Sequence, residues 1–203
     1  MAIALEKDLG KKSFTYADCL EWDEDLRAEI IDGSLYVKSP PATDHQRVGL
    51  ELSYQIKGFL RGKTPEVFIA PFGVRLFPKK DLSDGTLVEP DIVVVCDPAQ
   101  IDKRGCNGAP DLIIEILSPS NSRHDRFTKF DLYLRAKVRE YWVVDPDEKE
   151  VQTYILAGDH YIAKAYGYNE PTIKPEDTVP DIVPVTVLPG LEIDLKTVFS
   201  TYS

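Results

Sequence analysis

The sequence predicts a mixed α/β fold, and three observations support this. Two β-branched runs, LVEPDIVVVCD (87–97) and APDLIIEILSP (109–119), are typical of buried neighbouring strands. Segments 45–60 and 123–136 have the character of helices, and turn signals at Asp32-Gly33 and at 146–149 each join strand-like pieces. The 203 residues are 43% hydrophobic and 29% charged, without repeats, so we expect one domain over residues 1–203.

In the N-terminal half, each expected element has a local cause. Thr15 is placed to cap a short helix from Tyr16 to about Trp22. The Asp32-Gly33 pair predicts a tight hairpin between RAEII and SLYVK. After the break SPPAT, apolar residues at three- and four-residue spacing predict an amphipathic helix from His45 to Leu60. EVFIAPFGVRLF (66–77) then predicts a strand interrupted near its proline.

In the C-terminal half, a charged, glycine-rich stretch, IDKRGCNG (101–108), predicts a linker between the two buried runs. The polar segment SPSNS favours the start of a helix over 123–136, with Phe127, Phe130 and Leu134 as its core stripe. Two further elements follow: a hairpin of EYWVVD (140–145) and EVQTYIL (150–156), and a final helix near Leu195–Phe199.

The net charge of −10 is unevenly distributed along the chain. Residues 1–44 carry ten acids and five bases, and residues 141–203 carry eleven acids and four bases. Residues 101–140, in contrast, carry eight bases and six acids, while residues 45–100 are neutral. Because non-specific nucleic-acid binding depends on Lys and Arg displacing counterions, we expect binding to DNA to be weak without metal and sensitive to salt.

Several classes of protein are disfavoured by what the sequence lacks. No run approaches the roughly 20 apolar residues of a membrane helix, and the N-terminus does not resemble a secretory signal. We therefore expect a cytoplasmic protein with no membrane partner, and we expect Cys19, Cys96 and Cys106 to be free thiols. The sequence also contains no Gly-rich phosphate loop, G-x-S-x-G elbow or H-E-x-x-H pair.

Two carboxylates, Asp91 and Glu115, lie in the two buried runs. Side chains alternate along a strand, so Asp91 shares a face with Val93 and Val95, and Glu115 shares one with Asp111, Ile113 and Leu117. A carboxylate within an apolar strand is costly to bury unless it is paired or binds a metal. A salt bridge to an adjacent helix would explain it as well. Two carboxylates on adjacent strands could instead hold one divalent cation, which would activate a phosphodiester and a water for hydrolysis.

A lysine on the following helix is placed to join these carboxylates. If Glu115 lies about three residues before its strand ends, it is roughly 10 Å back along the strand. If the next helix folds back over the sheet, Lys129, about seven residues into it, lies roughly 10 Å back along the same direction. Its long side chain can then span the gap between helix and sheet. It would orient water or offset transition-state charge. Pairing with Asp125 on the helix surface is the competing interpretation.

His45, at the start of the amphipathic helix, could contact phosphate, metal-bound water or a carboxylate, or it could be a surface residue. Glu29 in the first hairpin is equally ambiguous and has no assigned role. His124 and His160 show no partner pattern, and we expect them to be solvated.

A series of segments carries a family resemblance. EIIDGSLYVKSPP, His45, EPDIVVVCD and GAPDLIIEILSPSNSRHDRFTKFDLYLRAKVREYWVVDP closely resemble the Uma-type family, whose members are described as restriction endonucleases and abound in cyanobacteria. The family belongs to the PD-(D/E)XK nuclease superfamily. The resemblance covers nearly the whole chain and is densest between Pro90 and Pro146.

The resemblance implies a restriction-endonuclease-like fold, with a central mixed sheet flanked by helices, and phosphodiester hydrolysis dependent on Mg²⁺ or Mn²⁺. Asp91 matches the first acidic position and Glu115 the second, and both are implied metal ligands. The superfamily's lysine two residues later is replaced by Leu117 here. In Uma-like sequences the lysine is displaced to the next helix, which points to Lys129. His45 matches the helix where the superfamily often has a further active-site residue, and homodimers are common.

Three functions remain open at this level. The first is a metal-dependent endonuclease acting on DNA, with Asp91, Glu115, Lys129 and His45 at its active site. The second is a non-catalytic binding or accessory module that retains the nuclease fold. The third is a hydrolase of another ester that uses the two carboxylates without metal.

Overall fold

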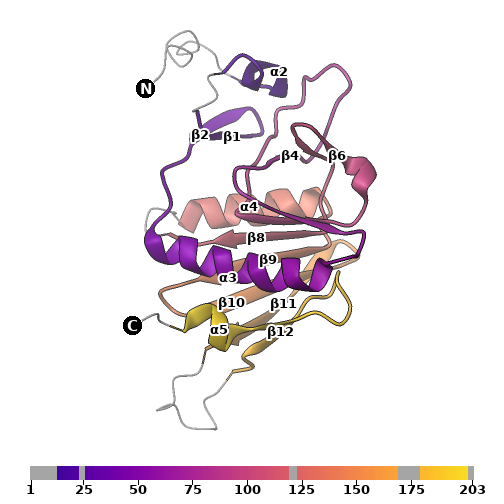
Figure 1. Ribbon diagram of the computed structural model, residues 1–203. Coiled ribbons are helices and arrows are strands. Elements are labelled where there is room, and N and C mark those ends of the chain that lie inside the picture. The colour runs from indigo at the N-terminus through magenta and orange to yellow at the C-terminus, as the bar shows by residue number, and fades with distance from the viewer. Residues whose placement is uncertain (1–12, 23–25, 119–122, 169–178, 201–203) are drawn as a thin grey trace.

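The structure is a computed structural model, which describes residues 13–22, 26–118, 123–168 and 179–200. Its centre is a six-stranded sheet in the order β11-β10-β9-β8-β5-β3. The two middle strands, β8 and β9, run parallel, and every other neighbouring pair is antiparallel. The predicted central mixed sheet flanked by helices is therefore confirmed (Figure 1). Its strands are β3 (Glu66–Ile69), β5 (Ile92–Val95), β8 (Leu112–Ile116), β9 (Glu140–Asp145), β10 (Glu150–Ala157) and β11 (His160–Gly167).

The sheet has a core on each face because its central strands are nearly continuous apolar runs whose consecutive side chains point to opposite faces. Helix α3 (Thr43–Leu60) buries Val48, Leu52, Ile56 and Leu60 against the face that carries Ile114 and Ile116. Helix α4 (Arg123–Arg135) buries Leu132 and Tyr133 against the opposite face, which carries Val93 and Ile113. The short helix α5 (Leu195–Phe199) lies beside α3, where the sequence predicts a final helix.

The predicted first hairpin is confirmed. Strands β1 (Ala28–Ile31) and β2 (Ser34–Val37) are joined by Asp32 and Gly33, both with positive φ, at 48° and 82°. Such a turn favours Asp-Gly because both central residues are left-handed. The hairpin docks on the rest of the chain through Ile30, which pairs with Leu87. In Figure 1 it lies on the same side of the sheet as α4, and the chain leads from β2 to the start of α3.

Some predicted boundaries are wrong. The expected linker 101–108 forms β6 (Ile101–Asp102) and β7 (Gly105–Asn107), which join β4 (Gly73–Arg75) in a three-stranded sheet. This pairing is tertiary, so local glycine content could not reveal it. The predicted interruption of the strand over 66–77 is confirmed, because β3 and β4 enter different sheets. The remaining elements are α2 (Tyr16–Cys19), shorter than expected, a 3₁₀ turn at Pro98–Gln100, β12 (Ile182–Pro184) and β13 (Glu192–Asp194).

The predicted core stripe of α4 is only partly right, because Phe130 packs against the core while Phe127 does not. Phe127 is 70% exposed, and Phe130 and Leu134 are only partly buried. The helix instead turns Leu132 and Tyr133 inward, together with the side chain of Lys129. Polar atoms on this inward face are needed because the sheet below carries a buried carboxylate. The segment SPSNS lies mostly outside the described residues.

No helix among the described ranges is long and apolar enough to cross a membrane.

A buried ion pair anchors the three-stranded sheet and gives a first prediction. The Asp84 carboxylate, 1% exposed, accepts hydrogen bonds from Arg75 Nε and Nη2 at 2.9 and 2.6 Å. Burial acts to raise the pKa of Asp84, but Arg75 and backbone donors outweigh it, and the pKa lies below its usual value. We expect Asp84→Asn to lower the free energy of unfolding by about 2 kcal/mol at neutral pH.

The lowered pKa also fixes the sign of the pH dependence. A carboxyl with a depressed folded-state pKa contributes stability above its unfolded pKa and loses it as pH falls through the folded value. The difference between wild type and Asp84→Asn should therefore shrink below about pH 4. Urea unfolding of both proteins between pH 7 and pH 3 measures it. A difference that grows on acidification would contradict the prediction.

Candidate active site

The two strand carboxylates meet at one end of the central sheet. Strands β5 and β8 are antiparallel neighbours with Ile92 opposite Ile114, and continuing that register by one residue places Asp91 opposite Glu115. The predicted alternation of the strands is confirmed, since Val93 and Ile113 pack on the α4 side while Ile92 and Ile114 pack on the α3 side. Asp91 itself directly precedes β5 rather than lying within it. Its Oδ2 accepts a hydrogen bond of 2.7 Å from the backbone N–H of Ile116, which ties the two strand ends together.

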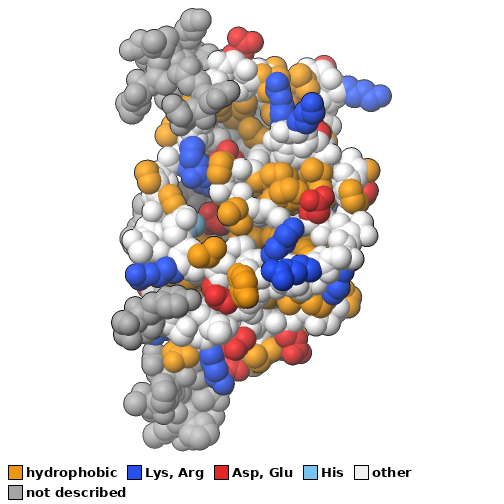
Figure 2. All heavy atoms as spheres, viewed as in Figure 1, with side chains coloured by type: hydrophobic (Ala, Val, Ile, Leu, Met, Phe, Trp, Pro, Cys, Tyr) orange, Lys and Arg blue, Asp and Glu red, His pale blue; other side chains and the backbone are white. Residues whose placement is uncertain are grey.

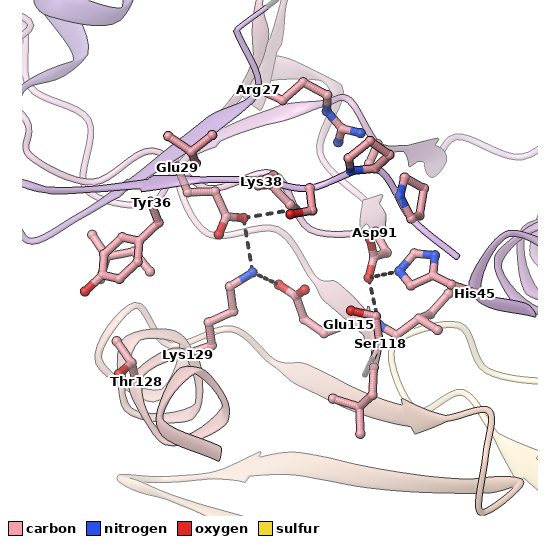
Figure 3. A pocket seen from close by; sticks show the side chains of 18 of the residues that line it. Arg27, Glu29, Tyr36, Lys38, His45, Asp91, Glu115, Ser118, Thr128 and Lys129 are labelled. Carbon is pink, nitrogen blue, oxygen red and sulfur yellow. Dashed lines mark hydrogen bonds and ion pairs between the residues drawn. The ribbon is translucent and has the colours of Figure 1, made fainter. Parts of the chain in front are cut away.

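Lys129 reaches from α4 to this point. Its Nζ lies 2.8 Å from Glu115 Oε1 and 3.1 Å from Glu29 Oε1 (Figure 3). The predicted contact between Lys129 and Glu115 is therefore present. The prediction assumed that the strand continues about three residues past Glu115, but β8 ends at Ile116. The Lys129 side chain is 14% exposed, which excludes the surface-lysine interpretation.

His45 approaches from the other side of Asp91. It lies in the first turn of α3, which begins two residues earlier than predicted, and its Nε2 is 3.1 Å from Asp91 Oδ2. The imidazole is only 11% exposed, which excludes the alternative that His45 is a surface residue. Its other nitrogen, Nδ1, is buried and has no hydrogen-bond partner in the part of the chain that the structure describes. Of the other histidines, His160 is exposed as predicted, and the side chain of His124 lies outside the described residues.

Sequence reasoning missed most of the hairpin's contribution. Glu29, left without a role, is 4% exposed, and its Oε1 accepts from Lys129, from the Glu89 N–H at 2.9 Å and from Lys38 Nζ at 3.4 Å. Lys38 also donates to the Glu89 carbonyl at 2.6 Å. Tyr133, from α4, donates its hydroxyl to Glu115 Oε1 at 2.5 Å.

One pocket of about 460 Å³ is lined by Asp91, Glu115, Lys129, His45, Glu29 and Lys38, whereas Tyr133 lies behind it. The pocket lies between the hairpin, the start of α3, the ends of β5 and β8, and α4 (Figure 3). In the space-filling view this face is hollowed, and a His and an acidic side chain are visible inside the hollow (Figure 2). The lining includes Arg27, Glu29, Tyr36, Lys38, Pro40, Pro41, His45, Asp91, Glu115, Ser118, Thr128, Lys129 and Tyr141.

The electrostatics divide the carboxylates into two kinds. Burial raises the pKa of Glu115, and the charges of Asp91 and Glu29 add to the rise, while Lys129 opposes it. At Asp91 and Glu29 burial also acts to raise the pKa, but His45 in the first case and Lys129 with Lys38 in the second outweigh it, so both values are lowered. Despite its burial, Lys129 has a raised pKa because Glu115 and Glu29 favour its charged form. Lys129 is therefore a fixed cation and not a proton acceptor at neutral pH.

The donor set fits Mg²⁺ or Mn²⁺ better than it fits a metal held wholly by protein. Within the described ranges, no group of three or more His, Cys, Asp and Glu side chains is placed to hold a metal ion. Asp91 and Glu115 supply two carboxylates, and Mg²⁺ is usually held by one or two carboxylates with waters and substrate phosphates completing its shell. Burial, with the nearby charges of Asp91 and Glu29, raises the pKa of Glu115, and a divalent cation bound beside it would act in the opposite direction.

The chain is similar to a family model and to several known proteins. A family model named Uma2 and described as "Putative restriction endonuclease" matches residues 16–192. Two curated proteins of Synechocystis, both named as uncharacterized, are similar: slr1290 is 27% identical over 66% of this chain and 70% of its own length. The other, sll1609, is 26% identical over 73% of this chain and 84% of its own length.

A solved structure shares the fold. A crystal structure from Anabaena variabilis, described as a putative nuclease belonging to DUF820, has a TM-score of 0.69 and 23% identity. The match covers 92% of this chain and 98% of that one.

Proposed function

The chain belongs to the Uma2 family, and on that premise we propose that it is a metal-dependent endonuclease that hydrolyses phosphodiester bonds of DNA. One observation carries the proposal: Asp91, Glu115 and Lys129, from two strands and a helix, converge in a single pocket. A structural ion pair between helix and sheet would explain the Glu115–Lys129 contact alone. It would not explain why a second carboxylate, Asp91, opens into the same pocket beside a histidine.

Each residue has a distinct proposed role. Asp91 and Glu115 would hold Mg²⁺ or Mn²⁺ through carboxylate oxygens. The ion supplies Lewis-acid polarisation of a phosphoryl oxygen and makes an attacking water more acidic. Lys129, held protonated by Glu115 and Glu29, would offset the negative charge that grows on the phosphate during in-line attack. His45 holds the Asp91 carboxylate in place through Nε2.

Metal removal tests this function. Purified protein is incubated with supercoiled plasmid and with circular single-stranded DNA, in Mg²⁺ or Mn²⁺ and in a chelator. We expect cleavage of at least one DNA with a divalent ion and none with the chelator. Asp91→Ala and Lys129→Ala proteins, purified in parallel, control for contaminating nucleases. Cleavage that persists undiminished in both variants would overturn the assignment.

Calorimetric titration with Mg²⁺ and Mn²⁺ separates this function from an accessory module. Binding heat that disappears in Asp91→Ala supports the nuclease. A folded protein that takes up neither ion at millimolar concentration and cuts neither DNA would favour the non-catalytic module. Cleavage that survives the chelator would favour a metal-free hydrolase.

A further inference from the structure

One face of the first hairpin points into the pocket. Glu29 lies opposite Tyr36 in the ladder, and the Lys38 N–H donates to the Arg27 carbonyl, so Arg27 and Lys38 are the next opposed pair. Alternate residues of a strand point the same way, and these four side chains all line the pocket. Glu29 is engaged by Lys129. Arg27, Tyr36 and Lys38 have no part in the hydrolytic chemistry.

Arg27 has a donor to spare. Its Nη2 lies 3.3 Å from Glu89 Oε2, at the rim of the pocket (Figure 3). Its Nε is buried and has no hydrogen-bond partner in the described part of the chain. A buried, unsatisfied donor is costly, and a guanidinium is well matched to phosphate oxygens. The Arg27 side chain lines the pocket and is 35% exposed, so its guanidinium can meet an anionic ligand there.

Tyr36 offers an aromatic surface on the same hairpin face, diagonal to Arg27 in the ladder. Its side chain lines the pocket while 37% of the residue remains exposed. An aromatic ring next to a cationic side chain is the combination with which proteins bind unpaired nucleotides, by stacking the base and contacting the phosphate.

The depth of the pocket restricts what can reach the carboxylates. The side chains of Asp91 and Lys129 are each only 14% exposed, and Glu115 is 9% exposed. A scissile phosphate must therefore enter the pocket, whose volume of about 460 Å³ is on the scale of a single small ligand. A duplex is stiff and presents its phosphates on a broad surface, whereas a flexible single strand can bend to carry one phosphate into a recessed site. The net charge of −10 also disfavours the extended phosphate contacts that hold a duplex.

We propose that the substrate is an unpaired DNA strand, and that the hairpin face binds the nucleotide beside the scissile phosphate, with Tyr36 stacking on the base and Arg27 contacting the backbone phosphate. This inference rests on the proposed endonuclease function for its reaction, but the strand preference can be measured without cleavage. Lys38 contributes positive charge to the same wall, while its ammonium is held by Glu29 and the Glu89 carbonyl.

Fluorescence anisotropy in a chelator at low salt tests the preference. The same labelled oligonucleotide is offered alone and as a duplex, and we expect the single strand to bind at least about 10-fold more tightly. Tyr36→Ala should weaken single-strand binding roughly 5-fold or more, whereas Tyr36→Phe should retain it. Tyr54→Ala is the matched control, since Tyr54 is 68% exposed on α3 and does not line the pocket.

The salt dependence tests the phosphate contact. Arg27→Gln should reduce the slope of log K against log salt for the single strand by about 0.7, the value expected for one lost phosphate contact. Arg47→Gln is the control, because Arg47 lies on the surface of α3 in an ion pair with Asp44. Its slope should match that of the wild type.

The outcomes separate the two proposals. Equal or tighter binding of the duplex, or no binding of either DNA, would overturn the strand preference. Identical behaviour of Tyr36→Ala and Tyr54→Ala would overturn the proposed stacking on Tyr36. If metal-dependent cleavage is observed alongside any of these binding results, the proposed nuclease function still stands. Absence of cleavage with either ion would overturn the nuclease function, and the binding ratio would still decide the strand preference.

Discussion

A Lys129→Met protein is expected to lose DNA cleavage by at least about 100-fold and to lose about 3 kcal/mol of unfolding free energy. Met retains most of the stem's volume and removes only the charge and its donors. Glu115 and Glu29, which are 7% and 4% exposed, would then face each other without the ammonium that lies 2.8 and 3.1 Å from them. Breaking a buried ion pair costs more than the pair contributes, because it leaves the partner charges buried and unpaired.

A second substitution separates charge from packing. In the double variant Glu115→Gln, Lys129→Met, one of the two facing charges is gone, so we expect much of the stability to return and the activity to stay lost. Lys137→Met is the matched control, since Lys137 follows the same helix, is half exposed and pairs with Asp159 on the surface. Urea unfolding and cleavage rates measure both effects. If Lys129→Met were as stable as the wild type, the contacts of Lys129 with Glu115 and Glu29 would not be a buried ion pair, and the prediction would be wrong.

The strand acids were predictable because the rule that places them is local. Side chains alternate along a strand with a period of two, so the sequence alone is enough to pair Glu115 with Ile113 and to separate it from Ile114. Two consecutive buried runs are also usually neighbours in a sheet. These two facts are sufficient to bring Asp91 near Glu115, and the family resemblance selects the same two residues.

The inward face of α4 was not predictable from apolar spacing. Phe127 and Phe130 are the largest apolar residues of the segment, and a helix over an ordinary apolar sheet would bury them. This sheet carries Glu115, so the helix turns Lys129 and the hydroxyl of Tyr133 toward it and leaves Phe127 exposed. Knowledge of the partner surface is needed to set the rotation of the helix.

The hairpin's contribution was hidden for a related reason. Glu29 lies 60 residues before Glu89 and 100 before Lys129 in the chain, and only the tertiary fold joins them. One local signal was available: Arg27 and Glu29 alternate with apolar residues on the first strand, as Tyr36 and Lys38 do on the second. The same alternation is typical of a strand whose charged face is exposed to water, so it could not reveal that this face lines a pocket.

Substitution of Asp91, the proposed metal ligand that does not contact Lys129, is expected to have the second large effect. We expect Asp91→Asn to lower metal-dependent cleavage by roughly 1,000-fold while the protein stays folded. The Asn oxygen can still accept the hydrogen bond from the Ile116 N–H, which is 2.7 Å long in the wild type, so the junction of β5 and β8 is kept. What disappears is the negative charge of one of the two proposed metal ligands.

Thermal unfolding with and without Mn²⁺ detects that loss independently of activity. A ligand that binds only the folded state stabilises it by about 2.7 kcal/mol at 100 times its dissociation constant. We expect the wild type to show such a rise in melting temperature and Asp91→Asn to show little. Asp97→Asn is the matched control, because Asp97 is exposed just beyond the other end of β5 and does not line the pocket. If Asp91→Asn gained as much from Mn²⁺ as the wild type and Asp97→Asn do, Asp91 would not be a metal ligand, and its contacts with His45 and Ile116 would be its only role.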